Sequence, residues 1–221
     1  MDLIDRSTFY DNMRNEMLSG KLTKDQVDGT TVILDFWESP PIKFTGKFKK
    51  NWDIRSLEWL AYVLATTYHE TARTMQTGDE YGSNAYFTRR YENNKRIAKM
   101  LGNNRKGDGA KFHGRGYVQI TGRSNYSKMS KIIRGYYSDA PDFTENPDAV
   151  KIPEYAVLIM FYGMIRGTFT GKALKHYIGD PDKGQNVDFF NARKIINGRD
   201  KAGLIRGYAE KAIHALTAEP R

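Results

Sequence analysis

The chain has 221 residues, of which 39% are hydrophobic and 28% are charged, and it carries a net charge of +9 and no cysteine. These values exclude a disulfide framework and are typical of a soluble globular protein with one good-sized domain. The most apolar segment, residues 156–165, is too short to span a bilayer, and residues 1–17 lack the apolar core of a secretory signal peptide.

The hydrophobic pattern predicts a mainly α protein. Two short helices are expected at 5–18 and 23–37, the second with Thr23 as its N-cap. A Pro- and Lys-rich linker at 38–51 precedes a strong helix at 53–74, which ends near Gly78. The later helices are predicted at 124–137, 153–167, 171–179, 186–197 and 201–217.

Residues 79–125 differ in character from the predicted helices, because they are rich in Gly, Asn, Tyr and Arg. Short strands or a hairpin are expected near residues 111–122. The predicted fold is therefore mainly α, with a small irregular or β lobe inserted after the first strong helix. The predicted domains are an N-terminal helical segment with its linker at 1–50 and a larger domain at 51–221.

The positive charge is unevenly distributed between these two regions. Residues 1–50 contain eight Lys and Arg and eight Asp and Glu, so the whole excess of +9 lies in residues 51–221. A basic surface attracts polyanions such as nucleic acid, anionic lipid or an acidic bacterial cell wall. Charge by itself does not choose among them, and an excess of this kind is most commonly a solvated surface.

The segment YHETARTMQTGDEYG, residues 68–82, begins like the helix of a zinc protease. Such a helix needs a second histidine one turn after the first, but Arg73 stands there after His69. No other histidine lies near enough to form a local ligand pair. We therefore expect no metal and no cofactor.

The same segment places Glu70 and Glu80 on either side of Gly78. On one unbroken helix their side chains would be about 15 Å apart along the axis, but a turn at the glycine would shorten that distance. Inverting glycoside hydrolysis uses two carboxyl groups roughly 6.5–9.5 Å apart. Because paired acids on a loop are more commonly solvated than catalytic, the spacing alone is a weak signal.

A second segment, FHGRGYVQITGRSNY at 112–126, combines glycines, aromatics and amides. Amides hydrogen-bond sugar hydroxyls and aromatic faces cover sugar rings, while Gly114 and Gly116 allow a backbone to approach a ligand closely. A tight turn followed by a helix cap would explain most of the same residues.

Four blocks in this order resemble glycoside hydrolase family 19, the plant-chitinase-type family, in particular its phage and prophage endolysin branch. They are HETA at 69–72, DEYG at 79–82, GRGYVQITGRSNY at 114–126 and NARKIING at 191–198. The matched region covers roughly residues 53–216, and the glycine-rich block is the most specific part. The resemblance implies a lysozyme-like α+β fold.

The resemblance also implies site residues. Glu70 matches the general acid and Glu80 the general base, with Asp79 and then Glu92 as alternatives for the base. Thr121 matches the position that holds the attacking water. The residues expected to bind the sugar chain or support the acid are His69, Gln119, Asn125, Tyr126 and Asn197. Arg206 lies one residue out of register with the arginine of plant members, so the candidate charge partners are Arg73, Arg89, Arg90 and Arg115.

The activity implied is hydrolysis of β-1,4 bonds in bacterial peptidoglycan by a monomer, with inversion. The place of action implied is the cell wall, after holin-type release from the host cytoplasm. The alternatives are a chitinase acting on poly-GlcNAc, a lytic transglycosylase and a non-catalytic wall-binding protein. No nucleic-acid-binding motif is present. The cationic helix at 201–216 suggests weak contact with anionic envelope lipid, although closing the core is the more common role of such a helix.

Overall fold

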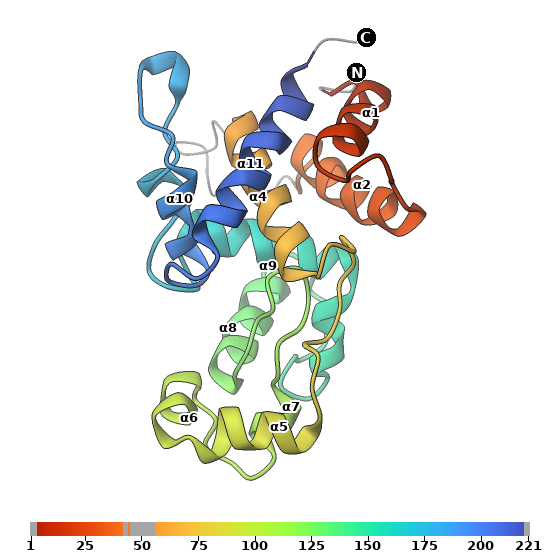
Figure 1. Ribbon diagram of the computed structural model, residues 1–221. Helices are drawn as coiled ribbons and strands as arrows, with labels where there is room; N and C mark the ends of the chain where they lie inside the picture. The colour runs from red at the N-terminus through yellow and green to blue at the C-terminus, as the bar shows by residue number, and fades with distance from the viewer. Residues whose placement is uncertain (1–3, 42–43, 45–55, 219–221) are drawn as a thin grey trace. The chain divides into compact units, whose positions relative to one another are not determined.

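A computed structural model describes residues 4–41, 44 and 56–218 (Figure 1). The described chain is mainly helical, which confirms the coarse fold prediction. Its β structure consists of isolated bridges that pair Asp79 with Arg115, Arg115 with Ile120, and Ile178 with Val187. The hairpin expected near residues 111–122 is thus a tight loop.

The chain separates into two compact units. Unit 1 comprises residues 1–75 and 160–221, and unit 2 comprises residues 76–159. The domain boundary predicted near residue 50 falls in unit 1 and among residues outside the described part. The first two helices belong to the same unit as the strong helix that follows them.

Unit 1 is built around one buried helix. Its main helices are α1 (Arg6–Glu16), α2 (Lys24–Glu38), α4 (Leu57–Glu70), α10 (Phe189–Ala192) and α11 (Ala202–Thr217). All residues from Leu60 to Tyr68 of α4 are buried, and α11 lies along α4 and also contacts α1 and α10. The last residue of α4, Glu70, is therefore held on a rigid element.

The helix starts follow local hydrogen-bonding rules. Thr23 caps α2 as predicted, since its hydroxyl accepts from the Gln26 backbone while the Gln26 side chain accepts from the Thr23 N–H. The Ser56 hydroxyl accepts from Trp59 N–H and starts α4 at Leu57. Residues 53–55 of the predicted helix lie outside the described part.

Unit 2 contains several short helices where irregular structure was expected. They are α5 (Asn84–Thr88), the π-helix η1 (Arg89–Asn93), α6 (Lys95–Leu101) and α7 (Asp108–Lys111). Helix α8 (Arg123–Arg134) follows them, close to the helix predicted at 124–137. Ser83 and Asn94 cap α5 and α6, and Gly102 ends α6 in the left-handed region at φ 68°. The composition predicts loops here, because Ser, Asn and Gly are common both in loops and at helix ends. The boundary at residue 159 falls inside α9 (Pro153–Arg166).

Two predicted helices in the C-terminal third are shorter than expected. The segment 171–179 forms only a 3-10 turn, Leu174–His176, because Gly171 has φ 82° and Ile178 pairs with Val187. The segment 186–197 reduces to α10 and the 3-10 turn η5 (Arg193–Ile195).

The C-terminal helix α11 closes the core of unit 1. Ile205, Ala209 and Ala212 on its apolar face are buried, and α4 and α1 pack against the helix. The buried part of this face packs inside unit 1, whereas Leu204 at its edge is 45% exposed. No helix among the described residues has the length and apolar character needed to cross a bilayer.

Candidate active site

Glu70, the predicted acid, is fixed by a buried arginine. Arg193 of η5 is 2% exposed, and its Nη1 donates to Glu70 Oε1 at 2.6 Å. Its Nε donates to the Asp200 carbonyl oxygen at 2.9 Å. The guanidinium is thus anchored on one side and holds the glutamate with the other, which gives the carboxylate a defined orientation.

Sequence reasoning missed Arg193, although it lies inside the block NARKIING that carried the resemblance. The candidate charge partners have other surroundings: Arg115 pairs with Asp79 and Asp148, and Arg89 and Arg90 lie over the ring of Tyr86. The one signal in the sequence was the position of Arg193, which follows Ala192 in a half-apolar turn. The structure shows that Ala192 is buried. Arginine is seldom fully buried without a charged partner.

His69 and Asn197 belong to the same unit as Glu70. His69 is half-buried, and this burial lowers its pKa although the neighbouring Glu70 charge acts to raise it. The imidazole is therefore mainly neutral at pH 7. The Asn197 N–H bonds to the Arg193 carbonyl oxygen at 2.9 Å and its side chain is exposed. The Asn197 amide is thus available to a ligand.

The chain turns immediately after Glu70, before it reaches Gly78. Ala72, Arg73 and Met75 have positive φ angles of 49°, 74° and 59°, a region that costs non-glycine residues about 1 kcal/mol each. Thr71 secures the turn, because its hydroxyl donates to the Thr67 carbonyl oxygen and accepts from Met75 N–H. Gly78 is not among the residues with positive φ, so the local turn lies at residues 71–75 and not at Gly78, where it was predicted.

Glu80, the predicted base, is held within unit 2 by side-chain and backbone donors. The Tyr91 hydroxyl lies 2.7 and 2.9 Å from the two carboxylate oxygens, and the Gly114 N–H donates to Oε2 at 3.2 Å. The Glu80 N–H in turn donates to the Gly114 carbonyl oxygen at 2.7 Å. A β-carbon on Gly114 would lie 3.1 Å from Glu80 Oε2, so a side chain at this position would make the carboxylate shift by a few tenths of an ångström.

Tyr91 keeps its proton under ordinary conditions. Burial and the hydrogen bond to Glu80 both raise the pKa of its phenol well above the usual range. The phenol therefore remains a donor, and Glu80 receives a neutral hydrogen bond that orients its carboxylate without cancelling its charge.

The two alternative bases have other partners. Asp79 forms ion pairs with Arg115 at 3.0 Å and Lys151 at 2.7 Å, and it bonds to His113 Nε2 at 3.0 Å. Burial acts to raise the pKa of Asp79, but the hydrogen bonds from Lys151 and His113 outweigh it and lower the pKa. Glu92 Oε2 accepts from the N–H groups of Gly107 and Gly109 and so organises that loop.

The glycine-rich block forms a self-bonded loop in unit 2. Gln119, with φ 51°, donates from its amide to the carbonyl oxygens of Gly78 and Gly116. The Thr121 hydroxyl donates to the Gln119 carbonyl oxygen at 3.0 Å, and the Asn125 amide donates to the Thr121 carbonyl oxygen at 2.7 Å. These amide nitrogens support the loop itself.

Tyr126 does not present a surface to a groove in this structure. It is fully buried, its hydroxyl donates to the His113 carbonyl oxygen at 2.8 Å, and Arg115 donates to that hydroxyl at 3.0 Å. The Tyr126 ring packs in the core against Phe112. The sequence pattern does not distinguish such a buried ring from an exposed ring that binds a sugar.

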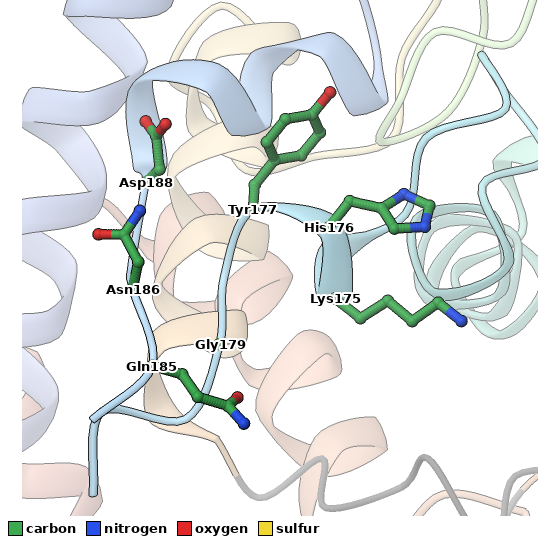
Figure 2. A pocket seen from close by; sticks show the side chains of 7 residues that line it. All are labelled: Lys175, His176, Tyr177, Gly179, Gln185, Asn186 and Asp188. Carbon is green, nitrogen blue, oxygen red and sulfur yellow. The ribbon is translucent and has the colours of Figure 1, made fainter. Parts of the chain in front are cut away.

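Unit 1 also contains a polar pocket of about 240 Å³ that includes none of the predicted site residues. Its lining residues are Lys175, His176, Tyr177, Gly179, Gln185, Asn186 and Asp188. Figure 2 shows Asn186 and Asp188 on one arm of a loop and Tyr177 and Gly179 on the other. His176 Nδ1 accepts from Ala173 N–H, so the neutral ring carries its proton on Nε2.

No protein-family model matches the chain, and a search of curated proteins finds no significant match. The described residues contain no cluster of three or more His, Cys, Asp or Glu side chains that could hold a metal ion. The geometry of the site residues therefore carries the functional argument, together with the sequence resemblance.

Proposed function

We propose that the protein is a glycoside hydrolase that cleaves β-1,4 bonds of bacterial peptidoglycan with inversion, as an endolysin does. The observation that carries the proposal is that both predicted glutamates are partly shielded and fixed by donors from remote segments of their own units. General acid–base catalysis needs carboxyl groups that are held in a fixed orientation. A solvated acid on the surface has no such requirement. We further propose a lysozyme-like α+β fold, as the resemblance implies.

Glu70 is the proposed general acid. Arg193 occupies Oε1, and no described residue hydrogen-bonds Oε2. We assign Oε2 as the atom that delivers the proton to the leaving glycosidic oxygen. The neighbouring residue in the sequence, His69, is kept mainly neutral by burial.

Glu80 is the proposed general base. In an inverting reaction the base takes a proton from the water that attacks the anomeric carbon as the glycosidic bond breaks. Glu80 faces the neutral Tyr91 hydroxyl, whereas Asp79 is matched by two cations. The Thr121 proton goes to the Gln119 carbonyl oxygen, so its lone pairs are free to accept a hydrogen bond from that water. The mechanism requires about 6.5–9.5 Å between the two carboxyl groups.

Peptidoglycan is the proposed substrate because the basic surface suits an anionic envelope. A chitinase would use the same two glutamates on poly-GlcNAc, and a non-catalytic wall-binding protein would bind without cleaving. A transglycosylase would leave Glu80 and Thr121 without a role.

Muropeptide analysis of purified sacculi tests the proposal. The wild-type chain should lyse permeabilised Gram-negative cells and release fragments with new reducing ends. Glu70→Gln and Glu80→Gln should both bind sacculi and release nothing, because glutamine keeps the shape and accepts from the same donors. Glu145→Gln, at an exposed acid of unit 2, is the control and should remain active.

The other outcomes identify the alternatives. Anhydro products would indicate a transglycosylase, preferential cleavage of chitin oligomers a chitinase, and binding without cleavage by the wild type a wall-binding protein. Full activity in both glutamine variants would exclude the assigned acid and base.

A further inference from the structure

The positive charge of unit 2 is concentrated in one segment. Residues 89–111 contain eight Lys and Arg and two acids, which leaves an excess of +6 in 23 residues. The excess for the whole of unit 2, residues 76–159, is +5 from 14 basic and nine acidic residues. The rest of the unit is therefore close to neutral.

Both acids of this segment are turned to internal partners. Asp108 is 1% exposed, and it accepts from Arg123 Nε at 2.9 Å and from the backbone N–H groups of Asn104 and Arg105. Glu92 accepts from two glycine N–H groups of the same loop. Neither acid offsets a surface cation.

The cations face solvent instead. We call the exposed members of this group the cationic face, and they are Arg89, Arg90, Lys95, Arg96, Lys99, Arg105 and Lys106. Within the part of the chain that the structure describes, no carboxylate forms an ion pair with any of them. The two elements that carry five of them, η1 and α6, contact each other, and Arg105 and Lys106 lie in the loop that follows α6. Helices α5, α6 and α7 gather at one end of the unit (Figure 1).

Helix α6 combines these charges with an exposed apolar side chain. At 3.6 residues per turn, Lys95, Arg96, Lys99 and Met100 fall within an arc of about 140°. Ile97 and Ala98 lie on the opposite side, half-buried and buried respectively. Met100 is 70% exposed. A flexible thioether among cations suits the boundary between lipid headgroups and acyl chains.

We propose that the cationic face binds an anionic phospholipid surface, with α6 lying along the headgroups and Met100 reaching the acyl boundary. Four to eight clustered Lys and Arg residues on an amphipathic helix or beside a membrane are typical of this mode. The contact is independent of glycoside hydrolysis, and it involves a different element from the C-terminal helix α11, in which Ile205, Ala209 and Ala212 are buried.

Co-sedimentation with vesicles tests this inference on the full chain. Vesicles of phosphatidylcholine with added phosphatidylglycerol should bind the wild type, and vesicles of phosphatidylcholine alone should not. The triple variant Lys95→Gln, Arg96→Gln, Lys99→Gln should bind on the order of 100-fold more weakly at low salt, since each cation near an anionic surface contributes about fivefold.

A matched control separates position from net charge. Lys172→Gln, Arg199→Gln and Lys211→Gln remove three exposed cations from unit 1, and together they should weaken binding by no more than about threefold. Met100→Ser should retain binding at low salt but lose the part that survives high salt.

The proposal fails if both triple variants lose binding equally, because the effect would then be one of net charge. It also fails if no vesicle binds, or if duplex DNA binds through the same three residues while vesicles do not. All the substituted side chains are exposed, so unchanged thermal unfolding is expected and confirms that each variant is folded.

Discussion

Arg193 and Glu70 are 123 residues apart in the sequence and form a 2.6 Å ion pair in unit 1. The arginine side chain is 2% exposed and the glutamate 16%. A guanidinium in this position is costly to leave unpaired, because a buried charge without a partner loses its hydration. The pair therefore couples the end of α4 to the turn η5.

Removing Arg193 should test this coupling. Arg193→Met should lower the free energy of unfolding by about 3 kcal/mol, because it leaves Glu70 partly buried without its cation. Under the proposed function it should also reduce lysis strongly, since the acid loses its orientation. Chemical denaturation and turbidity measure the two effects. Arg199→Met, at an exposed site, should change neither, and a similar loss in that control would contradict the role of the pair.

Tyr91→Phe should separate orientation from charge at Glu80. The variant removes the hydroxyl that donates to both carboxylate oxygens, but it keeps the ring that stacks on Phe87. We expect a stability loss of about 1 kcal/mol, together with a fall in kcat of at least about tenfold. Steady-state kinetics on soluble muropeptides provide the measurement. An unchanged kcat would mean that Tyr91 does not position the base.

Substitution by alanine should destabilise the protein at one glycine near Glu80 and have almost no effect at another. A β-carbon at Gly114 would meet Gln119 Oε1 at 3.0 Å and Glu80 Oε2 at 3.1 Å, whereas one at Gly78 would meet nothing within 4 Å. Gly114→Ala should cost about 1–2 kcal/mol and displace the base. Gly78→Ala should be neutral within about 0.5 kcal/mol. Thermal unfolding and lysis assays compare the two variants. A severe loss of stability in Gly78→Ala would support the turn that was predicted at that residue.

Asp108 should make stability depend on pH in the acid range. Burial acts to raise its pKa, but the bonds from Arg123 and from backbone N–H groups lower it below 3.8. The folded state therefore holds its proton less tightly than the unfolded state. The contribution of Asp108 to the free energy of unfolding is fully present above about pH 3.8, and it is lost as the pH falls through the lowered pKa. Asp108→Asn should make the free energy of unfolding less dependent on pH in this range, and it should lower that free energy by about 3 kcal/mol at pH 7. Denaturation at several pH values shows whether it does.

His69 should contribute in a higher pH window. Its pKa is lowered from 6.5 by burial, so the unfolded chain binds more protons between the lowered value and 6.5. Stability from this group is complete above pH 6.5 and declines as the pH falls through the folded pKa. NMR titration of the ring should give a pKa below 6.5. His69→Gln should reduce the slope of stability against pH.

The sequence by itself determined the longer helices, and it is the source of the proposal that Glu70 and Glu80 are the acid and the base. Periodicity and capping depend on neighbours within a few residues, so Thr23 and the helices α1, α2, α8 and α11 could be read along the chain. The short helices from Asn84 to Lys111 were missed because their caps have the composition of loops.

Only the tertiary structure decided which partners those glutamates have. Arg193, Tyr91 and Gly114 lie 123, 11 and 34 residues from the carboxylates they bind, and no periodic pattern encodes contacts over such separations. The same holds for Tyr126, because an aromatic residue in a glycine-rich block reads alike whether it is buried or exposed. Burial depends on what the rest of the chain packs against it, which a local pattern does not contain.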